Sequence, residues 1–123
     1  MSRPEMQTPL ARARGAGSAH HGAHHWCAQR VSAVALLPLS LWFLGVLLQL
    51  IPADHAAFER WIGAMPNRVL LAALLLALFH HLALGLQTVA EDYLHRADLK
   101  TAMVIGIQLG CALLAMTGLL ALL

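Results

Sequence analysis

The sequence is 123 residues long, which is enough for one domain. Hydrophobic residues make up 59% and charged residues 11%, so the chain is too apolar for a disordered protein, a nucleic-acid-binding protein or a self-sufficient soluble enzyme. The net charge of +2 is too small to predict a polyanionic partner, and the composition instead indicates a membrane protein.

The N-terminal residues 1–25 are interpreted as a flexible cytoplasmic tail that precedes a membrane domain over residues 26–123. This segment contains prolines, glycines and arginines without apolar periodicity. Its histidine tract at 20–25 reads HHGAHH, and such a tract is able to bind a transition metal. We favour a solvated tail, since a role as a metal-transport accessory would depend on this tract alone.

Three long stretches carry no formal charge, at residues 31–53, 69–90 and 101–123. A helix rises about 1.5 Å per residue, so about 20 apolar residues cross a hydrocarbon core of about 30 Å. We therefore predict an all-α membrane protein with three transmembrane helices, near 31–51, 69–90 and 101–123. The first stretch is too long, and starts too far along the chain, for a secretory signal.

Smaller features mark the course of these helices. Pro38 lacks a backbone donor and is expected to kink the first span. Asp54 is a suitable N-cap for a short amphipathic helix that Pro66 would end. The apolar face of that helix is predicted to contain Phe58, Trp61, Ile62 and Met65. A face for helix packing in the third span is predicted from the small residues Ala102, Gly106 and Gly110.

The distribution of cationic residues predicts the orientation of the chain. Arg60 and Arg68 lie on one side of the three spans. The other side carries Arg3, Arg12, Arg14, Arg30, Arg96 and Lys100. By the positive-inside rule, we expect a cytoplasmic N-terminus, a cytoplasmic 91–100 loop and a periplasmic C-terminus. The lack of an evident Arg-rich amphipathic presequence favours the cytoplasmic membrane of a bacterium over a mitochondrial membrane.

The candidate chemistry lies in residues 80–95, which read HHLALGLQTVAEDYLH. Ionisable residues inside a membrane span are costly and therefore indicate function. One helix face is predicted to carry His81, Gly85, Thr88 and Asp92. His81 lies there between the small residues Ala77 and Gly85, an arrangement suited to the axial ligand of a haem. His80 points about 100° away and is the weaker candidate. Alternatively, each histidine hydrogen-bonds a neighbouring helix.

Asp92 and Tyr93 follow at the predicted cytoplasmic surface of the membrane. A quinone headgroup needs a hydrogen-bond donor to its carbonyl oxygen, and it needs protons when it is reduced. Tyr93 is able to supply the donor, and Asp92 is able to belong to the proton path. The alternative is an interfacial tyrosine beside a solvated carboxylate, with no ligand. No set of residues indicates hydrolytic catalysis.

Residues 80–95 resemble the second helix of the hydrophobic membrane anchor subunit of succinate dehydrogenase, respiratory complex II. The shared pattern is His-x3-Gly-x6-Asp-Tyr, represented here by His81, Gly85, Asp92 and Tyr93. The start of the first span, HHWCAQRVSAVALLPL, is also similar to that family and places Arg30 at the helix entrance.

This resemblance implies roles for four residues. His81 would be an axial ligand of haem b, shared with a histidine of a cytochrome b anchor subunit, with His80 as the alternative ligand. Tyr93 would donate a hydrogen bond to ubiquinone, beside Asp92. Arg30 would lie near the haem propionates, whose charge it would offset.

The resemblance also implies partners and a division of labour. A flavoprotein subunit would oxidise succinate, and an iron–sulfur subunit would pass electrons to ubiquinone, which links the tricarboxylic acid cycle to the respiratory chain. This chain would be a subunit of that enzyme without being the dehydrogenase itself. Two alternatives stay open, namely the anchor of a quinol:fumarate reductase and a structural or assembly membrane protein without a cofactor.

Overall fold

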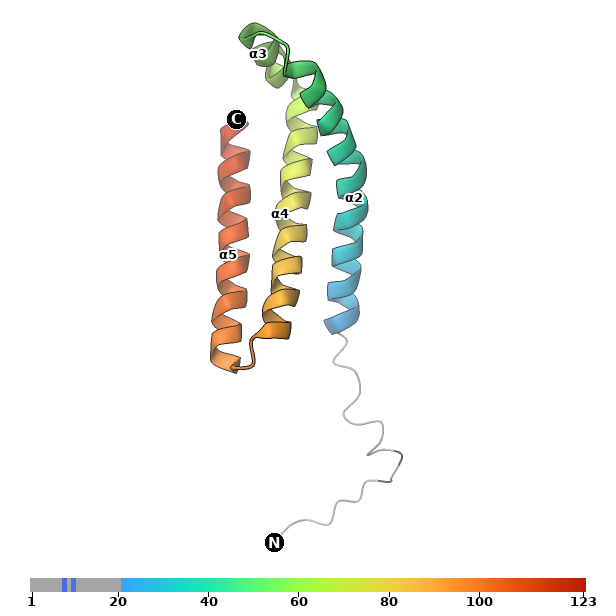
Figure 1. Ribbon diagram of the computed structural model, residues 1–123, viewed down its shortest axis with the longest axis vertical. Helices are drawn as coiled ribbons and strands as arrows, with labels where there is room; N and C mark the ends of the chain where they lie inside the picture. The colour runs from blue at the N-terminus through green and yellow to red at the C-terminus, as the bar shows by residue number, and fades with distance from the viewer. Residues whose placement is uncertain (1–7, 9, 11–20) are drawn as a thin grey trace.

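The computed structural model describes residues 8, 10 and 21–123, so most of the predicted tail lies outside the described residues. Over residues 21–123 the chain is entirely helical apart from its connections. The helices in chain order are α2 (His21–Leu50), α3 (His55–Gly63), α4 (Met65–Tyr93) and α5 (Ala97–Ala121). The three long helices lie side by side, and α4 is the central one, in contact with both α2 and α5 (Figure 1).

The prediction of three transmembrane helices is confirmed. Helices α2, α4 and α5 are each long and apolar enough to cross a membrane. Each helix begins before the span predicted from the charges. A helix can continue through charged and polar residues outside the hydrocarbon region. The length of an uncharged stretch therefore underestimates the length of the helix.

Helix α2 shows this difference most clearly, because it begins at His21 and includes the last five residues of the predicted tail. The residues between Gly22 and Arg30 include good helix formers such as Ala23 and Ala28, so the helix extends past the uncharged stretch. It also continues through Pro38, and Figure 1 shows a curved helix rather than a broken one.

The predicted short helix is present as α3. The backbone N–H of Ala57 donates to Asp54 Oδ1 at 2.8 Å, which confirms the N-cap. The prediction that Pro66 ends this helix is wrong, since α3 ends at Gly63. Pro66 lies in the first turn of α4, where its missing N–H removes no helical hydrogen bond.

Two side chains of α4 fix the end of α3 against the bundle. Asn67 Nδ2 donates to the Trp61 carbonyl oxygen, and Arg68 Nε donates to the Ile62 carbonyl oxygen, each at 2.8 Å. The Trp61 ring also stacks on Trp42 of α2, with ring centroids 6.2 Å apart. These contacts hold α3 across the ends of α2 and α4, as Figure 1 shows.

Helix α5 packs on α4 through small residues other than Gly106 and Gly110, whose face stays a prediction for contact with another helix. Cys111 and Ala115 are buried, and a Cβ added at Gly118 would lie 3.0 Å from Leu75 Cδ1. A Cβ added at Gly106 or Gly110 would have no atom of another described residue within 4 Å. The predicted small-residue face is therefore not the one that meets α4, because the helix is rotated to bring a different face to the contact.

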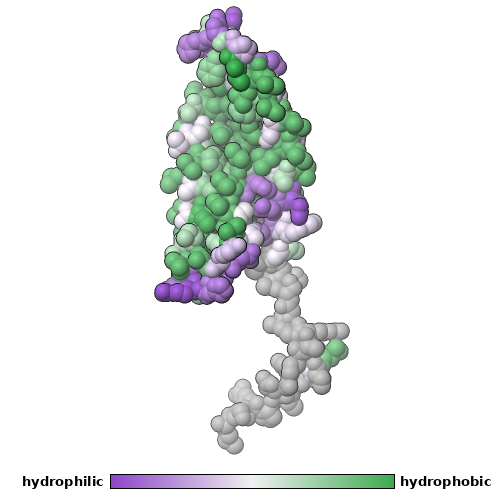
Figure 2. All heavy atoms as spheres, in the orientation of Figure 1, coloured by the Kyte–Doolittle hydropathy of each residue, from purple (hydrophilic) through white to green (hydrophobic). Residues whose placement is uncertain are grey.

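The surface of the bundle is divided into zones. Figure 2 shows hydrophilic residues at both ends of the three helices and a broad hydrophobic band between them. Large apolar side chains such as Leu41, Leu113 and Leu120 are exposed in the three long helices. An apolar surface of this extent is what a lipid bilayer or other membrane helices would cover.

Candidate functional site

The candidate residues gather where the first turns of α2 run beside the second half of α4. The two helices are antiparallel, so the start of α2 and the end of α4 lie at the same end of the bundle (Figure 1). A direct contact confirms this register, since His25 Nε2 lies 3.2 Å from Thr88 Oγ1. Arg30 near the start of α2 and Asp92 and Tyr93 at the end of α4 therefore belong to one half of the molecule.

The face of α4 that carries His81, Gly85 and Thr88 is turned toward α2. His81 Nδ1 lies 2.9 Å from Ser32 Oγ, and Thr88 contacts His25. Between these two pairs, Gly85 also faces α2, since a Cβ there would be in ordinary van der Waals contact with a side-chain nitrogen of Gln29, at 3.7 Å. The three residues thus share one face, as their spacing predicts.

Ser32 is the member of this site that sequence reasoning missed. It is 6% exposed and is the buried polar residue among those the structure describes. Its hydroxyl donates to the Gln29 carbonyl oxygen at 3.0 Å and also meets His81. The sequence feature that could have indicated Ser32 is its hydroxyl group within an apolar helix, two positions after Arg30.

His80 occupies a different environment from His81. Its side chain is exposed, and within residues 21–123 it has no hydrogen-bond partner. It lines a cavity of about 780 Å³ between α2 and α4. Polar residues of that cavity include His25, Gln29, His80, Gln87, Thr88 and Glu91. Figure 2 shows a hydrophilic patch on the lower half of the bundle, on the side of α2.

One polar atom in this region lacks a partner. Gln29 Oε1 is buried, and no donor among the described residues reaches it. Leaving a buried acceptor unpaired costs about 1–3 kcal/mol, so a water molecule, a ligand or a partner is expected to supply the missing donor. Gln29 lines the same cavity as Gly85 and His80.

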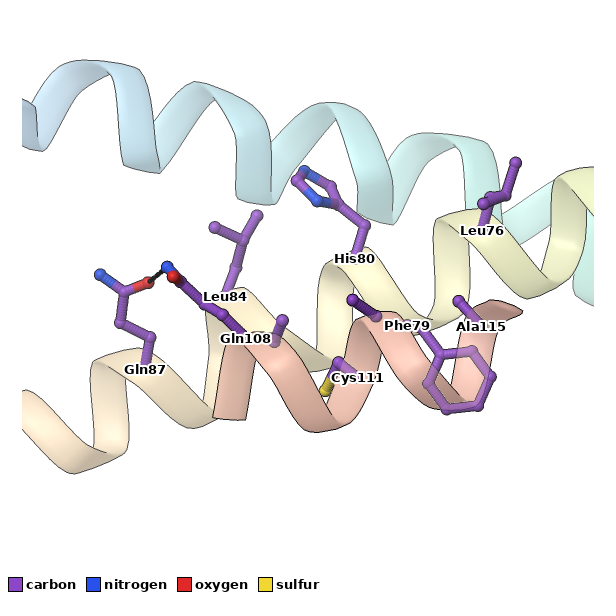
Figure 3. Close-up of a pocket in the computed structure, with 10 residues that line it drawn as sticks. Leu76, Phe79, His80, Leu84, Gln87, Gln108, Cys111 and Ala115 are labelled. Atoms are coloured by element: carbon purple, nitrogen blue, oxygen red, sulfur yellow. Dashed lines mark hydrogen bonds between the residues drawn. The ribbon is translucent and has the colours of Figure 1, made fainter. Parts of the chain in front are cut away.

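A second cavity of about 340 Å³ lies between α4 and α5 (Figure 3). Gln87 links the two helices, because its Oε1 accepts from Gln108 Nε2 at 3.3 Å and its Nε2 donates to Glu91 Oε1 at 2.8 Å. Figure 3 shows the His80 ring directed toward α2, away from this amide pair. The hydrogen-bonded side chains of Glu91, Gln87 and Gln108 therefore form a polar row between α4 and α5.

Asp92 and Tyr93 form the last turn of α4. Both side chains are exposed, Tyr93 to 78%, and within residues 21–123 neither makes a hydrogen bond. The phenol hydroxyl and the carboxylate are consequently accessible at the end of the bundle. The structure brings them to the same half of the molecule as Arg30 without a direct contact between them.

Arg30 is exposed on α2, and its guanidinium carbon lies 5.5 Å from the centre of the Trp26 ring. This cation–π contact orients the side chain without neutralising its charge. In the described part of the chain, Arg30 forms no ion pair with a carboxylate. Its positive charge remains available to an anionic group.

A single histidine nitrogen is the ligand that one protein chain would contribute to half of a haem site. No group of three or more His, Cys, Asp or Glu side chains in the described part of the chain is arranged to hold a metal ion alone. Haem iron needs only an axial nitrogen from each protein chain, because the porphyrin supplies the other ligands. His81 has one ring nitrogen paired with Ser32 and the other, Nε2, unpaired within residues 21–123.

Comparison with known proteins identifies the family of this chain. The family described as the succinate dehydrogenase/fumarate reductase transmembrane subunit matches residues 4–119. The chain belongs to this family of membrane anchors. The succinate dehydrogenase hydrophobic membrane anchor subunit of Rickettsia bellii is 33% identical over 85% of this chain and 84% of that protein. The subunit of the same name in Paracoccus denitrificans is 30% identical over 88% of this chain and 84% of that protein.

Membership in the succinate dehydrogenase anchors confirms the resemblance that residues 80–95 indicated. It also accounts for the three long apolar helices, which make the anchor a multi-pass membrane protein. The family match extends well beyond the 80–95 segment in both directions, so the assignment does not depend on one motif.

Proposed function

We propose that this succinate dehydrogenase anchor supplies one axial ligand to haem b and part of a ubiquinone site. One arrangement carries the proposal, namely that the central helix α4 holds His81 within its apolar stretch and ends in the exposed pair Asp92 and Tyr93. A redox cofactor inside the membrane and a quinone at its surface would then lie along a single helix.

His81 would hold the haem iron through Nε2, and a histidine of a cytochrome b anchor subunit would provide the other protein ligand. The haem, when bound, supplies one-electron redox chemistry. Gly85, four residues along the same face, lines the cavity between α2 and α4. Arg30 offers an unpaired cation to the propionates. His80 is the alternative ligand.

At the end of α4, Tyr93 donates its hydroxyl proton in a hydrogen bond to a ubiquinone carbonyl oxygen. Reduction of the quinone takes up two electrons, which an iron–sulfur subunit provides, and two protons. Asp92 is adjacent in sequence and exposed, so it is able to exchange protons with the aqueous phase and pass them to the site.

The proposed setting is the cytoplasmic membrane of a bacterium, with the α4–α5 connection facing the cytoplasm. The flavoprotein and iron–sulfur subunits would then bind on the side of Asp92 and Tyr93. The relatives named above are anchors of succinate dehydrogenase, which supports succinate oxidation over the reverse reaction of a quinol:fumarate reductase.

Two matched substitutions in the purified complex test the haem assignment. His81→Ala should remove most of the b-type haem absorption, because no other residue on that face of α4 offers a nitrogen ligand. His80→Ala should leave the absorption largely unchanged. If His80→Ala removes the haem and His81→Ala does not, the ligand is His80. If neither substitution changes the haem content, this chain provides no axial ligand.

A further inference from the structure

We propose that Ser32 is a positioning residue that holds His81 in the tautomer whose Nε2 is free to bind haem iron. The inference rests on the proposed haem function. It assigns a role on α2 to a residue that does not touch the iron. The role follows from two hydrogen bonds that Ser32 makes at once.

The geometry connects three groups in a row. His81 Nδ1 lies 2.9 Å from Ser32 Oγ, and Ser32 Oγ lies 3.0 Å from the Gln29 carbonyl oxygen. Ser32 is 6% exposed, so water does not compete freely for its hydroxyl group. Within residues 21–123, Ser32 is the hydrogen-bond partner of His81.

Counting protons decides the direction of both bonds. For both contacts to be hydrogen bonds, the single hydroxyl proton of Ser32 has to point to the Gln29 carbonyl oxygen, which carries no proton of its own. Ser32 Oγ therefore has only lone pairs to offer to the imidazole. The bond to His81 then requires a proton on Nδ1, and a neutral imidazole with a proton on Nδ1 has its lone pair on Nε2. The helix α2 thus selects the tautomer of a residue on α4.

This selection has two consequences for a metal ligand. The hydrogen bond fixes the rotation of the ring, so Nε2 is presented in one direction. It also draws the Nδ1 proton toward Ser32, which makes Nε2 a stronger electron donor. A stronger donor stabilises ferric iron relative to ferrous iron and lowers the reduction potential of the haem. His80 has no comparable partner within the described residues.

The test uses two substitutions of the same shape. Threonine and valine differ chiefly by the exchange of a hydroxyl for a methyl group, so Ser32→Thr keeps the donor and acceptor and Ser32→Val removes them. Both would be introduced into the whole succinate dehydrogenase complex. The measurement is the midpoint potential of the haem, followed by its absorption during a redox titration. Ser40→Val, at an exposed position of the same helix, is the control.

We expect Ser32→Thr and Ser40→Val to keep the wild-type potential. Ser32→Val should make the potential more positive by about 59 mV, which corresponds to a roughly tenfold loss in the preference for ferric iron. Loss of haem from Ser32→Val alone, with haem retained in Ser32→Thr, would equally support the role of the hydroxyl. Equal potentials and equal haem contents in the two variants would overturn the inference.

The proposed haem function fails in a different way. A wild-type complex without haem would refute that function before any variant was made. A wild-type complex that contains haem, together with variants that do not differ, would refute only the role of Ser32.

Discussion

At the scale of single residues, polar side chains of α4 differ in whether a side chain of another helix forms a hydrogen bond with them. His81 and Thr88 are satisfied by α2, through Ser32 and His25 respectively. Tyr93, at the end of the helix, remains exposed and unpaired within residues 21–123. A paired group holds the helices in register, whereas an accessible donor at a membrane surface is free to bind a ligand. Tyr93 is therefore the residue by which the quinone proposal is best judged.

Tyr93→Phe keeps the aromatic ring and removes only the hydroxyl group. We expect quinone reduction by the complex to fall about 100-fold, the magnitude typical of losing one positioned hydrogen-bond donor. Succinate oxidation with an artificial electron acceptor should persist, because that reaction does not use the site at the end of α4. Unchanged quinone reduction would remove Tyr93 from the quinone site.

At the scale of elements, the contact between α4 and α5 depends on small residues. Gly118 allows α5 to approach Leu75 of α4 closely, whereas Gly106 on the same helix faces open space within the described residues. The two glycines therefore provide a matched pair for testing which face of α5 packs on α4.

Gly118→Leu should destabilise the chain by about 1–3 kcal/mol, since the added side chain has to displace Leu75 or separate the helices. Gly106→Leu adds the same atoms where nothing lies within 4 Å and should have a much smaller effect. Thermal unfolding of the purified chain in detergent measures both. A larger loss of stability from Gly106→Leu would mean that α5 is rotated relative to the arrangement described here.

The elements themselves were largely predictable from the sequence. Charge-free stretches predict α2, α4 and α5, and Asp54 predicts the start of α3, because both signals depend only on local chemistry. The face of α5 that meets α4 was not predictable, since several small residues compete for that role. The partner of His81 was not predictable either, because it depends on how far α2 is shifted along α4.

At the scale of the whole molecule, the three long helices leave much of their apolar surface uncovered. Only a few residues between the helices are buried, among them Leu74, Ala90 and Ala115. Lipid or other membrane helices have to cover the remainder, and the proposed half of a haem site would also require a partner. The molecule therefore has the features of a subunit that is completed by others.

The orientation in the membrane is a prediction at this scale. The C-terminus lies at the end of the bundle opposite the α4–α5 connection (Figure 1). If that connection is cytoplasmic, a reporter enzyme that is active only outside the cytoplasm should be active when fused after Leu123. The same reporter placed in the 91–100 loop should be inactive. The reverse pattern would place Tyr93 on the outer side, away from cytoplasmic subunits.

Whether this chain is a subunit of a haem-containing succinate dehydrogenase complex is tested most directly by its affinity purification in mild detergent. Every protein that accompanies it would be identified. We expect a flavoprotein, an iron–sulfur protein and a second, distinct anchor subunit with transmembrane helices to accompany it, together with the absorption of a b-type haem. A chain that is recovered alone and colourless would contradict the haem and quinone assignments together.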